Sequence, residues 1–174
     1  MKMFNLVLTA ICVAPAVGED LPLNPHLEPL RPLLEKTWKG TFTNSKPGNP
    51  IVDVGRWERV LNGQAVRRIH SVNEGAYGGE SLIFWDEQKK TVSVYYVTTA
   101  GFQSLGTLEF KDGKFMGHEN IQGDAGGVTE VRWIGELLPS GKFHMKAEYL
   151  KNGQWTFGRE VTYEESPGTS VVFK

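Results

Sequence analysis

Three runs rich in β-branched and aromatic residues follow one another between Gly79 and Phe110, and they constrain the fold more than any other part of the sequence. The runs read Gly-Glu-Ser-Leu-Ile-Phe-Trp-Asp, Thr-Val-Ser-Val-Tyr-Tyr-Val-Thr and Gly-Phe-Gln-Ser-Leu-Gly-Thr-Leu-Glu-Phe. Each is bounded by a short polar or glycine-containing break, a pattern typical of consecutive antiparallel strands. The same rhythm continues on both sides, so we expect one sheet that extends in both directions and closes on itself.

Seven further segments have strand character and are separated by turns or loops. Asn62-Gly63 and Asn152-Gly153 are strong turn signals, because this dipeptide favours the tight turns that join antiparallel strands. With the central runs, these segments predict an all-β chain of ten antiparallel strands. Ten meandering strands favour an up-and-down β-barrel, since a closed sheet has no exposed edge. The seven segments are Trp38–Phe42, Ile51–Leu61, Ala65–Val72, Phe115–Gln122, Thr129–Leu137, Phe143–Leu150 and Gln154–Tyr163.

Residues 1–18 have the three parts of a secretory signal peptide. Lys2 supplies a minimal charged region, residues 6–14 an apolar region, and Ala16-Val17-Gly18 a small-x-small cleavage site. The apolar run is too short to span a bilayer. We therefore expect cleavage near Gly18 and a mature protein that is periplasmic or secreted, without a stable membrane anchor.

A proline-rich arm, residues 19–36, precedes the predicted barrel. Four leucines in the arm have the spacing of a short helix with one apolar face, and two prolines keep that helix short. We expect this helix to plug one end of a barrel formed by residues 37–165, with residues 166–174 as a C-terminal tail. The leucines are Leu27, Leu30, Leu33 and Leu34.

Composition argues against several classes of site and partner. Cys12 is the only cysteine and lies in the predicted leader, which excludes disulfides, thiolate metal ligands and a cysteine nucleophile from the mature chain. A net charge of -1 argues against nucleic acid or an anionic membrane as a partner. The sequence has no Gly-x-Ser-x-Gly elbow, His-Glu-x-x-His motif, P-loop or dinucleotide fingerprint. Four histidines without carboxylate support predict no metal site.

Polar residues midway along apolar strand faces are the candidates for a ligand site, because alternate residues of a closed barrel face its lumen. One phenol of the Tyr95-Tyr96 pair is expected inside, where it can donate a hydrogen bond. Glu119 and Arg159 are expected to neutralise each other if both are buried. The candidate ligand-binding residues are Arg56, Glu58, Arg68, His70, Tyr96, Glu119 and Arg159.

The second predicted strand has two open interpretations, since a shift of one residue reverses the faces of a strand. Arg56 and Glu58 either face the lumen or form an ion pair in solvent, with Trp57 and Leu61 inside instead. The choice decides whether these two charged residues belong to the candidate site.

Three segments resemble a family of bacterial calycin-like β-barrel proteins of unknown function. They are Leu33-Leu34-x-x-x-Trp38-x-Gly40-Thr41, the strand end from Gly79 to Trp85-Asp86, and the strand from Trp155 to Thr162-Tyr163. The resemblance extends from about Leu30 to Glu165 and implies a lipocalin-like barrel. Its motifs are structural and imply no particular activity.

The nitrobindin-like haem-binding barrels, a related group, begin with a similar Pro-Leu and Trp-x-Gly segment. In that group the last strand supplies a histidine to the haem iron just ahead of Val-Thr-Tyr. Here Gly158-Arg159-Glu160 precedes Val161-Thr162-Tyr163, so the expected histidine is absent. We therefore expect no haem and no other cofactor.

Three classes of function remain open for such a barrel. The leading hypothesis is that it binds a small amphiphilic or hydrophobic molecule in its lumen. An alternative is an isomerase or hydrolase in which His70 or Glu119 is the general base, although His70 is also interpretable as a hydrogen-bonded structural residue. A third is a filled barrel that acts as a structural or interaction module. His118 and His144 are expected on the outer face in each case.

Overall fold

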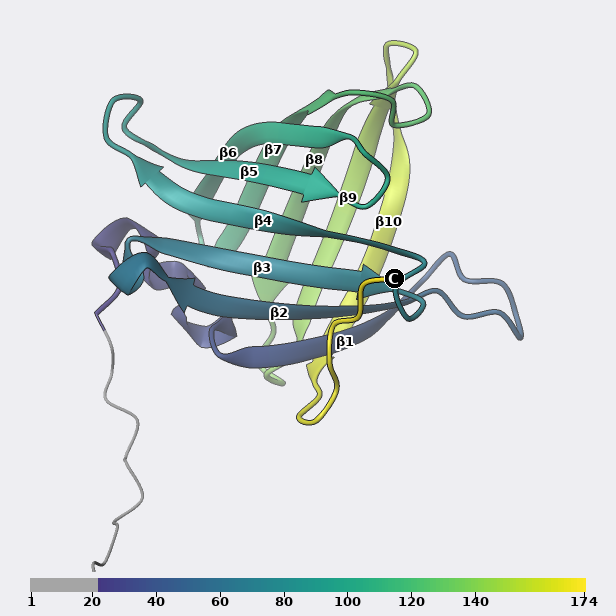
Figure 1. Ribbon diagram of the computed structural model, residues 1–174, viewed down its shortest axis with the longest axis horizontal. Coiled ribbons are helices and arrows are strands. Elements are labelled where there is room, and N and C mark those ends of the chain that lie inside the picture. The colour runs from purple at the N-terminus through teal and green to yellow at the C-terminus, as the bar shows by residue number, and fades with distance from the viewer. Residues whose placement is uncertain (1–21) are drawn as a thin grey trace, which may run out of the picture.

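The computed structural model describes residues 22–174, and the predicted leader, residues 1–18, lies outside this range. Within it the chain forms a closed barrel of ten antiparallel strands (Figure 1). Each strand pairs with its neighbour in sequence, and β1 pairs with β10 to close the sheet. This confirms the all-β, ten-stranded up-and-down barrel that the sequence predicts. The strands are β1 (Lys36–Phe42), β2 (Val52–Val60), β3 (Ala65–Val72), β4 (Tyr77–Asp86), β5 (Thr91–Thr98), β6 (Gln103–Lys111), β7 (Lys114–Gln122), β8 (Val128–Leu137), β9 (Phe143–Lys151) and β10 (Gln154–Glu165).

A 3-10 helix, η1 (Pro25–Leu33), lies at one end of the barrel as the plug that the sequence predicts. Its buried leucines recur at every third residue, which matches the three residues per turn of a 3-10 helix. Leu27, Leu30 and Leu33 therefore share one face, and each is 0% exposed. The two internal prolines lie on the exposed part of the helix.

Two contacts hold η1 against the strand ends. The N–H of Asn24 donates to the carbonyl of Gly63 at 2.8 Å, in the short turn η2 (Leu61–Gly63) between β2 and β3. The ring of His26 stacks on Trp85 of β4, with ring centroids 3.5 Å apart. Within residues 22–174, no helix is long and apolar enough to cross a membrane.

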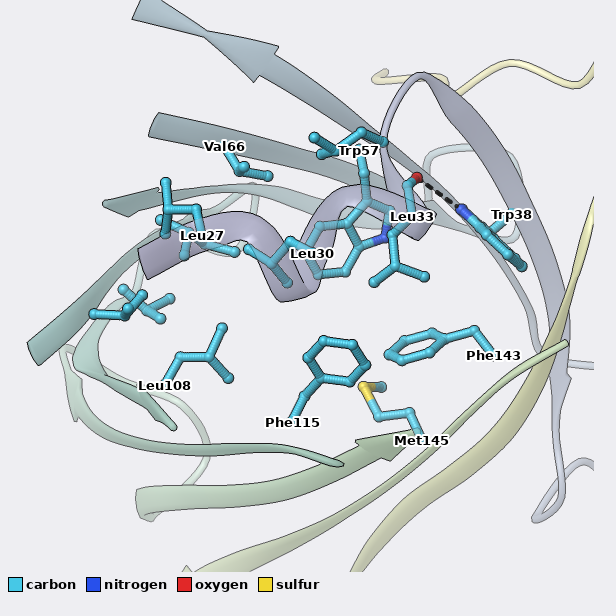
Figure 2. Packing of buried hydrophobic residues seen from close by; sticks show 14 of the residues in the cluster. Leu27, Leu30, Leu33, Trp38, Trp57, Val66, Leu108, Phe115, Phe143 and Met145 are labelled. Carbon is cyan, nitrogen blue, oxygen red and sulfur yellow. Dashed lines mark hydrogen bonds between the residues drawn. The ribbon is translucent and has the colours of Figure 1, made fainter. Parts of the chain in front are cut away.

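Apolar side chains fill the half of the barrel next to η1 (Figure 2). The leucines of η1 face Leu108, Phe115 and Phe143 across the core. Trp38 of β1 is 2% exposed, and its indole N–H donates to the carbonyl of Leu33 at 3.1 Å. The plug is therefore joined to the first strand by a buried hydrogen bond and to the opposite wall by packing.

The C-terminal tail, residues 166–174, runs along the outside of the barrel from β1 toward the turn between β3 and β4 (Figure 1). The N–H of Ser166 donates to the carbonyl of Thr37 at 2.8 Å, and the N–H of Val172 donates to Oγ of Ser71 at 3.1 Å. Ser71 is buried on the outer face of β3, because the tail covers it.

Candidate functional site

The half of the barrel away from η1 encloses a cavity of about 420 Å³. Trp57 and Phe143 form its floor over the filled core, and the β5–β6 and β7–β8 loops lie at its mouth. Ile83, Val94 and Ile121 belong to its largely apolar wall. The barrel is thus filled at one end and hollow at the other.

A series of buried hydrogen bonds leads from β2 to the cavity, with one residue from each of four neighbouring strands. Nδ1 of His70 lies 2.8 Å from Oδ1 of Asp53, and its Nε2 lies 2.7 Å from the hydroxyl of Tyr96. The Tyr96 hydroxyl lies 2.8 Å from that of Tyr77. Both tyrosines line the cavity, whereas Asp53 and His70 are 2% and 1% exposed and lie behind them.

The protonation state of His70 determines which group donates and which accepts in each hydrogen bond of this series. Burial and the charge of Arg68 lower the pKa of His70 to about 4, and they outweigh the hydrogen bond to Asp53, which raises it. The imidazole is therefore neutral at pH 7. Because the Asp53 carboxylate only accepts, Nδ1 carries the proton and Nε2 accepts from Tyr96. The Tyr96 oxygen in turn accepts from Tyr77.

Asp53 keeps its charge at neutral pH although it is buried. Burial raises the pKa of Asp53, but hydrogen bonds from His70 and Tyr163 and the charge of Arg68 together hold it below its ordinary value. The hydroxyl of Tyr163 donates to Oδ2 at 2.6 Å, and Arg68 donates to the same oxygen at 3.2 Å. Burial also raises the pKa values of Tyr96 and Tyr163, so both phenols remain donors.

Arg159 of β10 lines the cavity because a β-bulge interrupts its strand. Phe157 pairs with Glu148 and Arg159 pairs with Ala147, so β10 carries one extra residue, Gly158, at this point. The bulge leaves Phe157 outside, 50% exposed, and turns Arg159 inward. Strict alternation would have placed both side chains on one face.

Glu119 of β7 also lines the cavity, three strands away from β10 in the order of the barrel. The hydroxyl of Ser104 donates to one carboxylate oxygen, and the indole N–H of Trp133 donates to the other at 2.9 Å. The expected neutralisation of Glu119 by Arg159 is wrong, because no ion pair joins the two anywhere in the described chain. Neutral donors from neighbouring strands satisfy Glu119 instead.

The cavity brings together four of the seven candidate residues, namely Arg68, Tyr96, Glu119 and Arg159. His70 also faces inward, but it lies behind the cavity wall and is joined to it by the hydrogen bond to Tyr96. Of the two adjacent phenols, Tyr96 is inside, as expected, whereas the other phenol of the pair is exposed.

Arg56 and Glu58 point away from the lumen, so the interpretation that places them inside is wrong. Trp57 takes the inner position on β2, because its ring packs into the core, and its two neighbours therefore face outward. Nε of Arg56 donates to Glu58 at 2.9 Å, and Glu58 also pairs with Arg67 of β3. The solvent ion-pair interpretation is confirmed, except that Leu61 is 68% exposed rather than inside.

The outer face carries the other two barrel histidines, as expected. His118 lies 2.7 Å from Glu130, and His144 lies 3.0 Å from Glu160. Across residues 22–174, no group of three or more His, Cys, Asp or Glu side chains could hold a metal ion. The expected absence of haem and other cofactors stays a prediction.

Sequence reasoning missed Asp53, Tyr77 and Tyr163 as members of the inner polar network. Asp53 carried one signal, because aspartate is depleted within strands and its presence inside a predicted strand needs a reason. Tyr163 shares the inner face with Val161 and Arg159, which lie two and four residues before it, but nothing in the sequence names its partner.

Comparison with known proteins supports the fold alone. No family model matches this chain, and no curated protein matches it. Among solved structures, it is similar to the crystal structure of Rv2717c from M. tuberculosis, with a TM-score of 0.62. The two are 12% identical, and the match covers 83% of this chain and 99% of the other. The likeness spans the whole of that barrel at an identity too low to transfer a function.

Proposed function

We propose that this protein binds a small amphiphilic molecule in the lumen of its barrel. The observation that carries the proposal is a cavity of about 420 Å³ that has largely apolar walls and a few convergent polar side chains. Small-molecule sites have volumes in the range of roughly 300 to 1,000 Å³ and the same composition. The apolar part of the ligand would lie against Ile83, Val94 and Ile121, and its polar part near Arg68, Tyr77 and the bulge.

The contrast between the filled core and the cavity argues against the third hypothesis, a filled barrel that acts as a structural or interaction module. Protein interiors are packed as densely as organic crystals, with few voids larger than a water molecule. The plug half of this barrel obeys that rule, with Leu30 and Leu33 fully buried against aromatic rings. A hollow of this size in the other half is therefore a feature of the fold rather than loose packing.

The hydrogen-bonded series from Asp53 to Tyr77 resembles the groups of an acid–base catalyst, so catalysis in the same pocket is the second candidate function. A general base works best when its pKa lies near the working pH. The pKa of His70 is lowered to about 4, and burial raises the pKa of Tyr77 above its ordinary value. Neither group changes charge near pH 7, so the series suits the orientation of a ligand better than proton abstraction.

The sequence of residues 1–18 adds the proposal that the protein works in the periplasm or outside the cell. Its charged, apolar and small-residue regions support cleavage near Gly18. N-terminal sequencing of protein recovered from the periplasm or medium would give Glu19 as the first residue. Recovery of the full-length chain from the cytoplasm alone would contradict this part of the proposal.

The binding proposal is tested with N-phenyl-1-naphthylamine, an uncharged dye that fluoresces in apolar sites. Val94 and Val97 lie on the same strand, the first 5% exposed in the lumen and the second 41% exposed on the outside. We expect the wild-type protein and Val97→Trp to bind the dye, and Val94→Trp to lose binding because the larger ring fills the cavity. Native mass spectrometry of gently purified protein would then reveal any molecule that co-purifies. Absence of dye binding to a folded wild-type protein would contradict the proposal.

A further inference from the structure

Arg159 is the one charged side chain on the cavity wall that no other residue of the described chain satisfies. Its Nε is buried without a hydrogen-bond partner, and within residues 22–174 its guanidinium makes neither a hydrogen bond nor an ion pair. The guanidinium carbon lies 5.9 Å from the ring centroid of Phe42. A guanidinium cannot shed its proton in a protein, so this charge is permanent.

The other charged side chains of the cavity wall all have partners. Arg68 donates to Asp53 at 3.2 Å and lies over the ring of Trp57 at 5.7 Å. Glu119 accepts from a serine hydroxyl and an indole N–H on the neighbouring strands. Asp124, at the mouth, accepts from the backbone N–H two residues later at 2.9 Å. Arg159 differs from these residues, and this difference indicates that its hydrogen-bond partner is a molecule other than the protein.

The position of Arg159 is built by the fold rather than left to a flexible surface chain. The bulge at Gly158 turns the side chain inward, and a Cβ at position 158 would lie 2.8 Å from the ring of Tyr149. Tyr149 also lines the cavity, as Arg159 does. The glycine and the tyrosine thus hold the cation at one place on the wall.

We propose that the ligand carries a carboxylate group that accepts hydrogen bonds from Arg159. This inference rests on the proposed function and names the polar group of the ligand. The guanidinium fork matches the two oxygens of a carboxylate, and a buried cation is stabilised when such a partner is present.

The surrounding charges favour a carboxylate over a phosphate monoester. Arg68 and Arg159 line the cavity with Glu119 and Asp124, and the carboxylate of Asp53 lies behind the wall next to Arg68, so two positive and three negative side chains surround the site. A carboxylate adds one negative charge to this set, whereas a phosphate monoester adds up to two at neutral pH. Like charges in a partly enclosed site repel, so the singly charged group is the better fit.

The test measures displacement of N-phenyl-1-naphthylamine by decanoate, decanol and decyl phosphate, which share one chain length and differ in the head group. We expect wild-type protein to bind decanoate about tenfold to a hundredfold more tightly than decanol, the range expected for hydrogen bonds to a charged group. We expect decyl phosphate to bind less tightly than decanoate. Arg159→Gln should remove the preference for decanoate and leave the affinity for decanol unchanged.

Two further variants keep the test specific to the guanidinium of Arg159. Arg67 on β3 pairs with Glu58 outside the barrel, so Arg67→Gln should retain the wild-type preference for decanoate. Arg159→Lys, which keeps the charge without the fork, should retain part of that preference. Circular dichroism establishes that each variant is folded.

The outcomes separate the inference from the proposed function. If the wild-type protein binds no dye, the proposed lumen site itself is wrong. If dye binds but decanoate is no better than decanol, or if Arg159→Gln leaves decanoate affinity unchanged, the carboxylate assignment is overturned while the lumen site stands. Tighter binding of decyl phosphate than of decanoate would likewise overturn the carboxylate assignment.

Discussion

Nε2 of His70 lies 2.7 Å from the hydroxyl oxygen of Tyr96, and this contact joins the buried Asp53 carboxylate to the surface of the cavity. His70 is neutral at pH 7, so its Nε2 needs a donor, and the Tyr96 hydroxyl supplies it. The oxygen of Tyr96 then accepts from Tyr77, which leaves the lone pairs of Tyr77 available to a ligand donor. A ligand would therefore meet acceptors here and a cation at Arg159.

Replacement of Tyr96 by phenylalanine removes the donor to His70. Because an unsatisfied buried acceptor destabilises a protein, we expect Tyr96→Phe to lower the free energy of unfolding by about 1 to 3 kcal/mol. Tyr95 is the matched control, since it is 38% exposed and its hydroxyl donates to Gln103 on the outside of the barrel. Tyr95→Phe should stay within about 0.5 kcal/mol of wild type. Urea denaturation measures both, and equal losses would contradict a special role for the inner phenol.

The depressed pKa of His70 predicts a loss of stability in mild acid. The pKa of His70 falls from 6.5 in the unfolded chain to about 4 in the folded protein, so the unfolded state binds more protons between these values. This contribution to stability is fully present above pH 6.5 and is lost as the pH falls through about 4. At 1.36 kcal/mol per pKa unit, the loss is about 3 kcal/mol.

The measurement for this prediction is the free energy of urea unfolding at several pH values between 7 and 4, compared between wild type and His70→Gln. Glutamine keeps hydrogen-bonding atoms at this position and does not titrate. We expect the variant to be less stable at pH 7 and to lose less stability on acidification. Parallel pH profiles would show that His70 is not the source of the acid sensitivity.

The ten strands and the plug were accessible from sequence because their signals are local. Turn dipeptides such as Asn62-Gly63 mark the strand ends, and the spacing of Leu27, Leu30 and Leu33 places them on one face of any tight helix. These patterns depend on neighbouring residues alone. The fold class could therefore be predicted before any contact was known.

The inner face of β2 could not be predicted in the same way. Three valines alternate with Arg56 and Glu58, so the outer face has the more apolar appearance. The inner face holds Asp53 and Trp57, and Asp53 is stable there only because distant residues of β3 and β10 donate to it. Tyr163, one of these donors, lies 110 residues away along the chain. Hydrogen bonds between residues so far apart in the sequence leave no recognisable pattern in the residues next to Asp53.

The plug makes a prediction about stability that compares two leucines. Leu30 is 0% exposed in the core, whereas Leu61 is 68% exposed at the β2–β3 turn. Truncation of a buried leucine leaves a cavity, so Leu30→Ala should lower the free energy of unfolding by about 2 to 5 kcal/mol. Leu61→Ala should change it by less than about 0.5 kcal/mol. Similar effects of the two substitutions would mean that η1 does not contribute to the core.

The bulge in β10 gives the last prediction, because it links local backbone geometry to the position of Arg159. A Cβ at Gly158 would lie 2.8 Å from ring atoms of Tyr149, closer than real contacts allow. Gly158→Ala should therefore displace Tyr149 and lower the free energy of unfolding by about 1 to 3 kcal/mol. Gly55 on β2 is the control, since a Cβ there would meet nothing closer than 3.4 Å, and Gly55→Ala should have a smaller effect. If urea denaturation gave equal stabilities for the two alanine variants, Tyr149 would not be held against the bulge, and the fixed placement of Arg159 would lose its support.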